Sequence, residues 1–539
     1  MKYCRGCLDS PVDLSTANNG LRSHTIVHKR CGGTPVSRSR EQPILFLTFS
    51  TTLFWSLRTL SSRFRSAAAW NGTTQVLTYR LTIRWSRKIL CSPALVSCKR
   101  HKSEFVHDAC RTVIPCPEDR IPLKPQHLLY LVAAVLPSMY MAYLARRPET
   151  FLYRLMLLPL IVLVTLGTFF RFKIPGAEYT PVNWGIAAIA IFMVSRVIDW
   201  AWRPEGMLKV GEEKLGVFIN FPNQSRGGTS TDGTNDSRTS PSIWERHLPS
   251  RLYDALELFC TLRGIGWTFG VGVHVPREHK SLERFAFLRQ TLASALRRFV
   301  VLDFCESFVK LVPGGNLPEG GTIFRPELPI PQRYMLSTAV HVATGSMFIA
   351  GFELLYDLFT LIGVGLLSND PSSWPPVMDH PWQSDSLHEF WAKRWHQLLR
   401  ETFFVYGGFI GGAIAGNIGI VFGTFVGSGL LHELAICSHG RGFDPQGILF
   451  FVQQAPLLIL EKLWTRVTGH RVKGIYGRLW VLFCIVILGQ SLVDSWHRRG
   501  LGGCYVIDPR ISPVRLLLLP CLGWFTEYLG LHRISALLS

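Results

Sequence analysis

One histidine, His432, stands in a largely apolar stretch that runs from Gly423 to Ala435 and reads GTFVGSGLLHELA. A titratable imidazole at membrane depth is costly and usually marks a functional site. A neutral imidazole can take the proton of a hydroxyl group near neutral pH. We therefore predict that His432 is a general base that takes the proton of a hydroxyl group and so activates its oxygen as a nucleophile. The alternative is a histidine at the membrane interface with no chemical role.

Direct attack by the activated hydroxyl is favoured over a covalent intermediate on a serine of the protein. Ser428 lies four residues before His432, but a GxSxG nucleophile elbow needs a glycine two residues on either side of its serine. Val426 and Leu430 occupy those positions. The nearby serine is therefore not predicted to be a nucleophile.

A second segment with reactive side chains, SLHEFWAKRWHQLLR, runs from Ser386 to Arg400. Ser386 and Glu389 fit a capping box, which predicts a helix start. Apolar residues recur at helical spacing and basic residues fill the other face, so we expect an amphipathic helix at the membrane interface. It is either an anchor or a site for the phosphates of an acyl-CoA, which favour Lys and Arg. The candidate binding residues are Trp391, Lys393, Arg394, Trp395 and Arg400, with His396 as a second candidate catalytic residue.

The glycine-rich run between these segments must position them. A straight helix from Thr402 to Leu431 would be about 45 Å long, more than the ~30 Å hydrocarbon core of a bilayer. The helix is therefore expected to be tilted, broken or extended past the membrane. Its glycines have small-xxx-small spacing, which allows close helix packing. Asn417, an isolated amide in this run, needs a partner and is a candidate binding residue.

A weaker candidate site is Arg263-Gly-Ile-Gly-Trp267, where a cation and an indole flank two glycines. A glycine pair usually marks a turn. The pattern is therefore either a kinked helix end or a place where Arg263 and Trp267 bind an anionic ligand.

The composition indicates a membrane protein. Of 539 residues, 47% are hydrophobic and 17% are charged, against about 25% charged in soluble domains. Eight or nine hydrophobic segments predict an all-α, polytopic transmembrane helical bundle. The net charge of +20 is concentrated at the N-terminus, where residues 1–126 hold 20 Lys and Arg against 7 Asp and Glu. Because no nucleic-acid-binding module organises these cations, nucleic acid is not an expected partner.

The chain divides into four predicted regions. Residues 1–120 form a basic extension that is expected to be disordered, residues 121–203 the first transmembrane helices, residues 204–250 a polar loop, and residues 251–539 the main core. The polar loop carries two glycosylation sequons, at Asn223 and Asn235, which predict a glycoprotein if the loop is lumenal. Cys4 and Cys7 have CxxC spacing without a second pair, so no metal site is predicted.

Taken together, these motifs resemble the wax-synthase-like branch of the membrane-bound O-acyltransferases. The signature pieces are Arg263 to Trp267, Phe390 to Gln397 (FWAKRWHQ), Ser428 to His432 (SGLLH), and Phe450 to Glu461. By this resemblance His432 matches the family's catalytic histidine. His396 falls where many relatives in the wider superfamily carry asparagine.

Within that family the sequence looks most like the fungal branch that acetylates secondary metabolites. This resemblance implies acetyl-CoA as co-substrate, no bound cofactor, a hydroxylated terpenoid, meroterpenoid or related acceptor, and a multi-pass protein in the lipid bilayer of the endoplasmic reticulum. Two alternatives stay open: a wax ester synthase that joins long acyl chains to fatty alcohols, and a transporter or scaffold without chemistry.

Overall fold

The computed structural model describes residues 112–218, 247–312 and 317–529. Nearly all of the predicted N-terminal extension, both sequons and the CxxC pair lie outside the described residues. Within them the chain is mostly helical with very little strand, and seven helices are long and apolar enough to cross a membrane. The predicted polytopic helical fold is confirmed.

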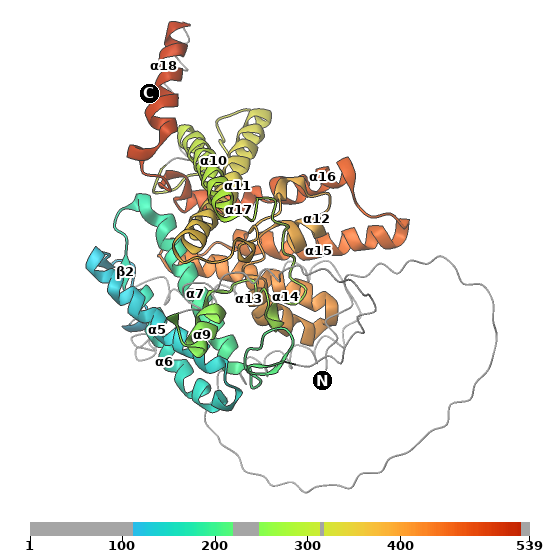
Figure 1. The fold of residues 1–539 in the computed structure, drawn as a ribbon. Coiled ribbons are helices and arrows are strands. Elements are labelled where there is room, and N and C mark those ends of the chain that lie inside the picture. Colours follow the sequence, from blue (N-terminus) through green and yellow to red (C-terminus); the bar gives the residue numbers. More distant parts are fainter. Residues whose placement is uncertain (1–111, 219–246, 313–316, 530–539) are drawn as a thin grey trace, which may run out of the picture. The chain divides into compact units, whose positions relative to one another are not determined.

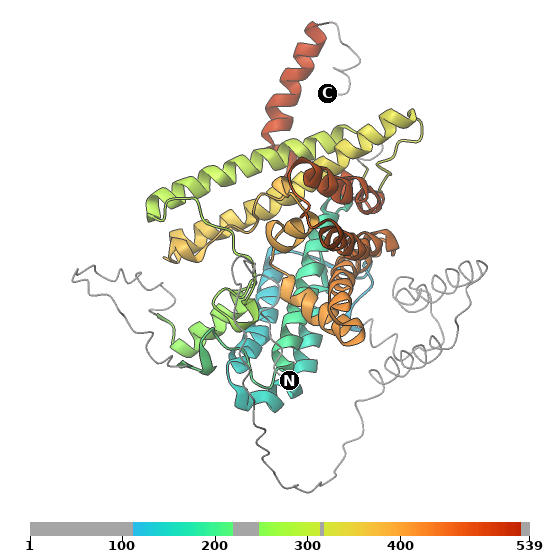
Figure 2. The same ribbon diagram turned by 90° about the vertical axis from the view of Figure 1, so that its right-hand side faces the viewer.

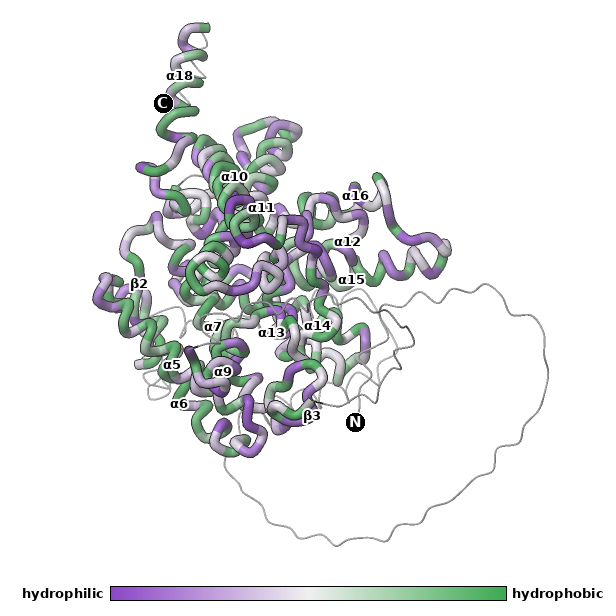
Figure 3. The backbone as a smooth tube through the Cα atoms, in the orientation of Figure 1, coloured by the Kyte–Doolittle hydropathy of each residue, from purple (hydrophilic) through white to green (hydrophobic). Residues whose placement is uncertain are grey.

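Three helices form the first layer of the bundle, and they pack side by side (Figure 1). They are α5 (Leu128–Ala145), α6 (Phe151–Phe169) and α7 (Thr180–Trp202). Hydrophobic residues dominate their length (Figure 3). Short 3-10 turns precede them, and the two-residue strands β1 and β2 pair in parallel beside them. These elements are η1 (Pro125–His127), η2 (Pro148–Thr150), η3 (Ala177–Tyr179), β1 (Ile121–Pro122) and β2 (Phe172–Lys173).

The described part of the predicted polar loop contains ordered structure. A small antiparallel hairpin forms from β3 (Glu212–Lys214) and β4 (Val217–Phe218). The chain continues through α9 (Ser250–Cys260) and the 3-10 turn η4 (Thr268–Gly270). Beyond these, α10 (Arg284–Leu311) and α11 (Ile330–Thr360) lie side by side and antiparallel (Figure 2).

The predicted amphipathic helix is shorter than expected. Only α12 (Leu387–Glu389) and the π-helix η8 (Phe390–Arg394) are helical, and Trp395 is extended. The start was predicted well, because the Ser386 hydroxyl accepts the Glu389 N–H at 3.0 Å. The early end follows from the fold around it: the Arg394 carbonyl accepts the backbone N–H of Asp379, which draws the chain away from the helix axis. The neighbouring short elements are η5 (Leu361–Leu366), η6 (Pro371–Ser373) and η7 (Pro381–Gln383).

The glycine-rich segment folds back on itself. α13 (Arg400–Phe403) and η9 (Phe404–Gly408) lead into α14 (Phe409–Cys437), which bends sharply at Ala415 and Gly416. Gly416 has a φ of +58°, a left-handed conformation that glycine adopts without strain. Of the three expected arrangements, the broken helix is therefore the one that the structure shows.

Glycines form the contact between the two arms of this hairpin. A Cβ atom on Gly407 would lie 1.9 Å from the carbonyl oxygen of Gly423, and one on Gly411 would lie 1.9 Å from that of Gly419. Backbones approach this closely only where side chains are absent. The predicted packing role of the glycines is thus confirmed, with the partner being the other arm of the same segment.

The remaining helices complete the bundle. α15 carries aromatic residues toward the glycine hairpin, and α17 packs against α11 and α15. The elements in order are α15 (Pro445–Thr468), α16 (Gly474–Leu482), η10 (Phe483–Ile487), α17 (Gln490–Arg498), η11 (Leu501–Gly503), η12 (Pro509–Ile511), η13 (Val514–Leu518) and α18 (Leu519–Tyr528).

The bundle has two ends, which we name by the ends of α7. At the Trp202 face, the Arg203 guanidinium donates to the Glu401 carboxylate at 2.7 Å. At the Thr180 face, the Arg441 guanidinium donates to the Thr180 hydroxyl at 3.4 Å. The segment that contains the glycine hairpin therefore enters at one face and leaves at the other.

Candidate active site

His432 is held in one tautomer by its own helix. Its Nδ1 atom lies 2.7 Å from the carbonyl oxygen of Ser428. A carbonyl can only accept a hydrogen bond, so Nδ1 carries the proton and Nε2 keeps its lone pair. This is the form of imidazole that a general base requires.

Two phenylalanine rings flank this imidazole. The ring of Phe451 on α15 stacks on it, with 4.8 Å between centroids and 20° between planes. Phe403, on the first arm of the glycine hairpin, has its ring centroid 6.4 Å away. The close approach of the two hairpin arms is what brings Phe403 to this position. His432 is only partly buried, so its ring is held by neighbours without being sealed off.

His396 lies beside His432, although 36 positions separate them in the sequence. Burial, and then the neighbouring His432 imidazole, lower the pKa of His396 to about 3. Its ring packs 5.0 Å from that of Phe352 and 5.3 Å from that of Trp395. His396 is therefore neutral at physiological pH, and it can offer a hydrogen bond but not a positive charge.

The predicted tryptophans contribute to an aromatic wall at this site. Trp391 packs edge-on against Phe425, with 5.5 Å between centroids, and approaches Phe451 at 6.3 Å. Its indole N–H donates to the side-chain oxygen of Gln454 at 3.2 Å. Trp395 stacks on the Phe390 ring at 5.5 Å. Gln454 thus fixes the orientation of the Trp391 ring.

The predicted cations of this segment take different positions. Lys393 and Arg400 are exposed, and Arg400 donates to the Gly272 carbonyl at 2.6 Å. Arg394 is turned inward, where it pairs with the Glu389 carboxylate at 2.8 Å. Asn417 is exposed at the bend of the glycine hairpin. About 15 residues of helix, or roughly 22 Å of rise, separate it from His432, so the structure does not bring the two together.

Arg263 and Trp267 both have partners within the protein. The Arg263 guanidinium donates to the carbonyls of Pro375, at 2.8 Å, and Pro376, at 2.6 Å. The Trp267 side chain is fully buried, and its indole N–H donates to Glu257 at 3.2 Å. These contacts hold the turn in place, and contact of either residue with a substrate remains a prediction.

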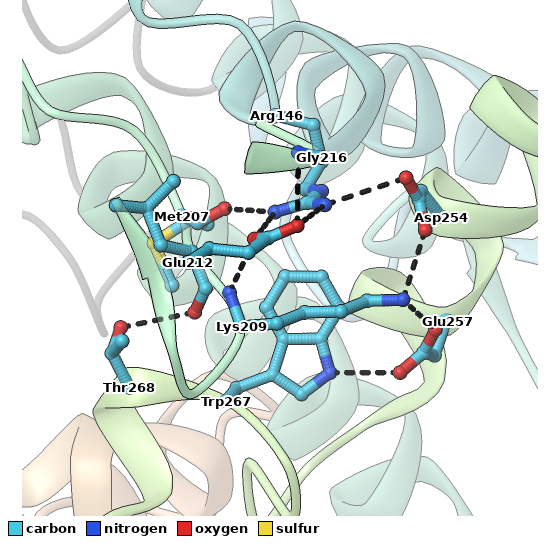
Figure 4. A network of polar contacts seen from close by, with 10 residues as sticks. Arg146, Met207, Lys209, Glu212, Gly216, Asp254, Glu257, Trp267 and Thr268 are labelled. Carbon is cyan, nitrogen blue, oxygen red and sulfur yellow. Dashed lines mark hydrogen bonds and ion pairs between the residues drawn. The ribbon is translucent and has the colours of Figure 1, made fainter. Parts of the chain in front are cut away.

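A polar network surrounds Trp267 (Figure 4). The Arg146 guanidinium lies over the indole at 5.0 Å and forms two hydrogen bonds to the Glu212 carboxylate, at 2.8 and 3.0 Å. Burial alone would raise the pKa of Glu212, but these bonds and two backbone N–H donors outweigh it and lower the pKa to about 2. Lys209 binds Asp254 at 3.0 Å on the other side of the ring. The network joins β3, α5 and α9 at one end of the bundle.

A buried ion pair next to the catalytic candidate was not predicted. The Glu433 carboxylate receives two hydrogen bonds from Arg499, at 2.7 and 3.0 Å. It also accepts the backbone N–H of Asp444, the residue that caps α15, at 2.9 Å. One carboxylate therefore links the helix of His432 to the start of the helix that carries Phe451.

We expect this ion pair to be a main source of local stability. Replacing Arg499 by leucine leaves the Glu433 charge buried and unpaired, which should lower the free energy of unfolding by about 3–5 kcal/mol. The double variant Glu433→Gln/Arg499→Leu should recover part of that loss. Thermal unfolding of purified protein in detergent measures both, and equal melting temperatures for the wild type and Arg499→Leu would contradict the assignment.

The sequence did not single out several residues of this site. They are either aromatic residues or residues far from their partners along the chain. Phe403 and Phe451 look like ordinary apolar helix positions. Arg499 lies 66 positions from Glu433. The sequence shows an acidic residue near the end of one apolar run and a basic residue near the end of another, but no local pattern pairs them. Glu461, the last residue of the motif Phe450 to Glu461, accepts the N–H groups of Leu387 and His388, at 2.7 and 3.1 Å, at the start of α12.

Comparison with known proteins agrees with this geometry. The membrane bound O-acyl transferase family model matches residues 374–453, which include His396 and His432. The acetyltransferase ataH of Aspergillus terreus is 33% identical over 27% of this chain and 51% of its own length. The acetyltransferase eriL of Hericium erinaceus is 24% identical over 50% and 72%. The O-mevalon transferase macI of Penicillium terrestre is 24% identical over 49% and 63%.

The chain spans about half of the length of ataH, 63% of the length of macI and 72% of the length of eriL. The family match lies in the part of the chain that holds both histidines, and the relatives are fungal proteins named as acetyltransferases or O-mevalon transferases. Together with seven apolar helices, these findings support a multi-pass membrane protein with a segment similar to the membrane bound O-acyl transferase family and with fungal acyltransferase relatives.

Proposed function

We propose that this chain is an O-acetyltransferase that moves the acetyl group of acetyl-CoA to a hydroxyl of a terpenoid, meroterpenoid or related secondary metabolite in the endoplasmic reticulum membrane. The observation that carries the proposal is the state of His432. Its Nδ1–H is bound to Ser428, which leaves Nε2 as a base inside a segment that matches an acyltransferase family. The names of the relatives support acetyl as the transferred group.

The proposed reaction is a single direct transfer. Nε2 of His432 takes the acceptor's hydroxyl proton while the hydroxyl oxygen bonds to the thioester carbonyl carbon. The carbon–sulfur bond then breaks, and the CoA thiolate leaves with the proton from the imidazolium. The products are an acetyl ester and CoA, and the histidine returns to its starting state.

His396 is proposed to hold one of the reacting oxygen atoms through a neutral hydrogen bond. Its low pKa excludes a positive charge at working pH. Hydrogen-bond donors aimed at developing charge are commonly worth 10²- to 10³-fold in rate, as an approximate scale. Asparagine, which the resemblance places at this position in relatives, can make the same kind of bond.

The substitution His396→Asn should therefore keep most activity, while His396→Leu should lower kcat by about 100-fold. Neither variant should move the acidic limb of the pH–rate profile, because His396 does not titrate between pH 5 and 9. Initial rates across that pH range check both points. A shifted limb in His396→Asn would show that this histidine is the titrating base.

The test of the function uses microsomes from a host that lacks the pathway. Labelled acetyl-CoA or palmitoyl-CoA is supplied with a panel of hydroxylated terpenoids and fatty alcohols, and products are read by mass. An acetylated terpenoid that disappears in His432→Ala supports the proposal. His388→Ala, an exposed histidine of the same segment, is the matched control. A palmitoyl ester of a fatty alcohol would instead establish a wax ester synthase.

The low pKa values also predict how stability depends on pH. Burial lowers the pKa of His396 and of His439 to about 3, and for His439 the nearby Arg120 contributes as well. The unfolded chain binds protons below about pH 6.5 where the folded chain does not, so stability should fall as the pH drops below that value. From pH 6.5 to 5 the loss should be roughly 2–4 kcal/mol for the two groups.

Melting temperatures at pH 7.5 and 5.0 measure this loss. The double variant His396→Gln/His439→Gln should show a smaller decrease between the two pH values than the wild type. A wild-type melting temperature that does not fall at pH 5.0 would contradict the burial of neutral imidazoles.

A further inference from the structure

The connection between α15 and α16 carries an unusual concentration of positive charge. Residues 462–478, here called the basic turn, contain five Lys and Arg and no Asp or Glu. All five side chains are exposed, as is His470. The cations are Lys462, Arg466, Arg471, Lys473 and Arg478.

Exposed apolar and aromatic side chains alternate with these cations. Tyr476 is 83% exposed, Val467 is 76% exposed, Ile475 is 64% exposed and Trp464 is 55% exposed. Hydrophilic residues gather where α15 meets α16, next to hydrophobic stretches on either side (Figure 3). A surface that joins aromatic rings with basic groups is typical of the boundary between membrane and water.

The position of the basic turn matches that boundary. The basic turn includes the end of one candidate span, at Thr468, and the start of the next candidate span, at Gly474. Arg478 pairs with Asp385 at 2.8 Å. The turn therefore lies at the Trp202 face, to which the segment from Trp374 to Glu401 also belongs.

Close packing fixes the turn to that segment. A Cβ atom on Gly477 would lie 1.8 Å from the carbonyl oxygen of Asp385. At the other end of the turn, Glu461 caps the start of α12 through the N–H groups of Leu387 and His388. The basic turn and the short helix before His396 thus form one connected unit.

We propose that the basic turn binds the headgroups of anionic phospholipids, with phosphatidylserine as the representative ligand. A cluster of four to eight Lys and Arg beside a transmembrane helix attracts the negative surface of the cytoplasmic leaflet, and each cation adds to the affinity. The exposed aromatic and aliphatic side chains favour a lipid over a free phosphate, because they can insert among acyl chains while the cations hold the headgroup.

The proposal also assigns a side of the membrane. Anionic lipids and positively charged loops both concentrate on the cytoplasmic side. The basic turn, the Trp202 face and the segment that bears Lys393 and Arg394 should therefore face the cytosol.

The full-length protein, purified in a neutral detergent, is titrated with fluorescent phosphatidylserine or phosphatidylcholine in mixed micelles. The test variant replaces four cations that lack an ion pair in the described residues: Lys462→Gln, Arg466→Gln, Arg471→Gln and Lys473→Gln. The control variant removes the same charge from exposed positions elsewhere: Lys214→Gln, Arg251→Gln, Arg277→Gln and Arg297→Gln. Elution as a single peak in size exclusion confirms that each variant is folded.

We expect the wild type to bind phosphatidylserine more tightly than phosphatidylcholine. The test variant should lose at least about ten-fold in affinity for phosphatidylserine, and the control variant should not. Equal binding by test variant and wild type would overturn the proposal. Displacement of the labelled lipid by CoA or by inorganic phosphate would assign the turn to those phosphates instead.

A second readout tests the side of the membrane independently of binding. A cysteine introduced by Gly469→Cys is treated with an impermeant maleimide in sealed microsomes, whose outer surface is cytosolic. Labelling above that of the parent chain before permeabilisation supports the proposal, and labelling only after it contradicts the proposal. Neither readout depends on acyl transfer.

Discussion

His432→Ala should abolish ester formation while the protein remains folded. The variant removes the nitrogen that takes the acceptor's proton, and general-base catalysis is typically worth about 10²- to 10⁴-fold in rate. The imidazole contributes little to folding, since it makes one hydrogen bond to its own helix and two ring contacts. Measured kcat should therefore fall by at least about 100-fold, with KM for the acyl donor nearly unchanged.

The size-exclusion profile and melting temperature of His432→Ala separate lost chemistry from lost folding. The control His388→Ala should match the wild type in both rate and stability. His432→Gln refines the test, because glutamine can keep a hydrogen bond but cannot accept the proton as a base. Activity retained in His432→Gln would contradict the proposed role and would favour a purely structural histidine.

The glycine hairpin should tolerate no side chain at its contact. In the variant Gly411→Val/Gly419→Val, the new Cβ atoms would lie 1.9 Å from backbone oxygen atoms of the opposite arm. No rotation of a side chain relieves such a contact, so the two arms must separate. Overpacking in a core usually costs about 1–3 kcal/mol for each site, and separation of the arms would also displace Phe403 from His432. We expect loss of the folded, monodisperse fraction.

Matched substitutions make that test specific. Gly351 lies inside α11 with no atom within 4 Å of an added Cβ, so Gly351→Ala should be neutral or stabilising by up to about 1 kcal/mol through helix propensity. Gly427→Ala should also be tolerated, because its nearest contact is 3.5 Å. Fluorescence-detected size exclusion measures the folded fraction of each variant. Equal folded fractions for the valine and alanine variants would contradict the hairpin contact.

The sequence predicts the helices well, and it points to individual candidate residues, because both leave local signals. Apolar run length identified the spans, and one imidazole in an apolar run identified His432. The bend at Gly416 has no comparable signal, since six other glycines of α14 are helical. The length of the apolar run could show that a straight helix would be too long for a bilayer, but it could not show where the helix breaks.

Long-range pairings account for the rest of what the sequence could not show. The end of the helix at Arg394 depends on a hydrogen bond from Asp379, and the pairing of Glu433 with Arg499 depends on how α14 and α17 pack. The partners of Arg263 are backbone carbonyls of a proline-rich segment 112 residues away. Such contacts follow from the assembled fold and leave no local pattern.

The antiparallel packing of α10 on α11 also affects how many times the described part of the chain crosses the bilayer. At one end of α10, Arg284 donates to the Gly365 carbonyl, and at the other end Lys310 donates to the Cys504 carbonyl, so α10 runs the full length of the bundle. Near its middle, Arg298 pairs with Glu353 of α11 at 3.0 Å. Adding α10 to the seven apolar spans makes the count even.

An even number of crossings returns the chain to the side from which it started. This agrees with contacts at the Thr180 face, where Ile121 donates its backbone N–H to the Arg171 carbonyl and Tyr505 donates its N–H to the Glu178 carbonyl, both at 2.9 Å. The segments around Ile121 and Tyr505 therefore lie at the same face of the bundle. Epitope tags inserted beside Ile121 and beside Tyr505 should accordingly report the same side of the membrane.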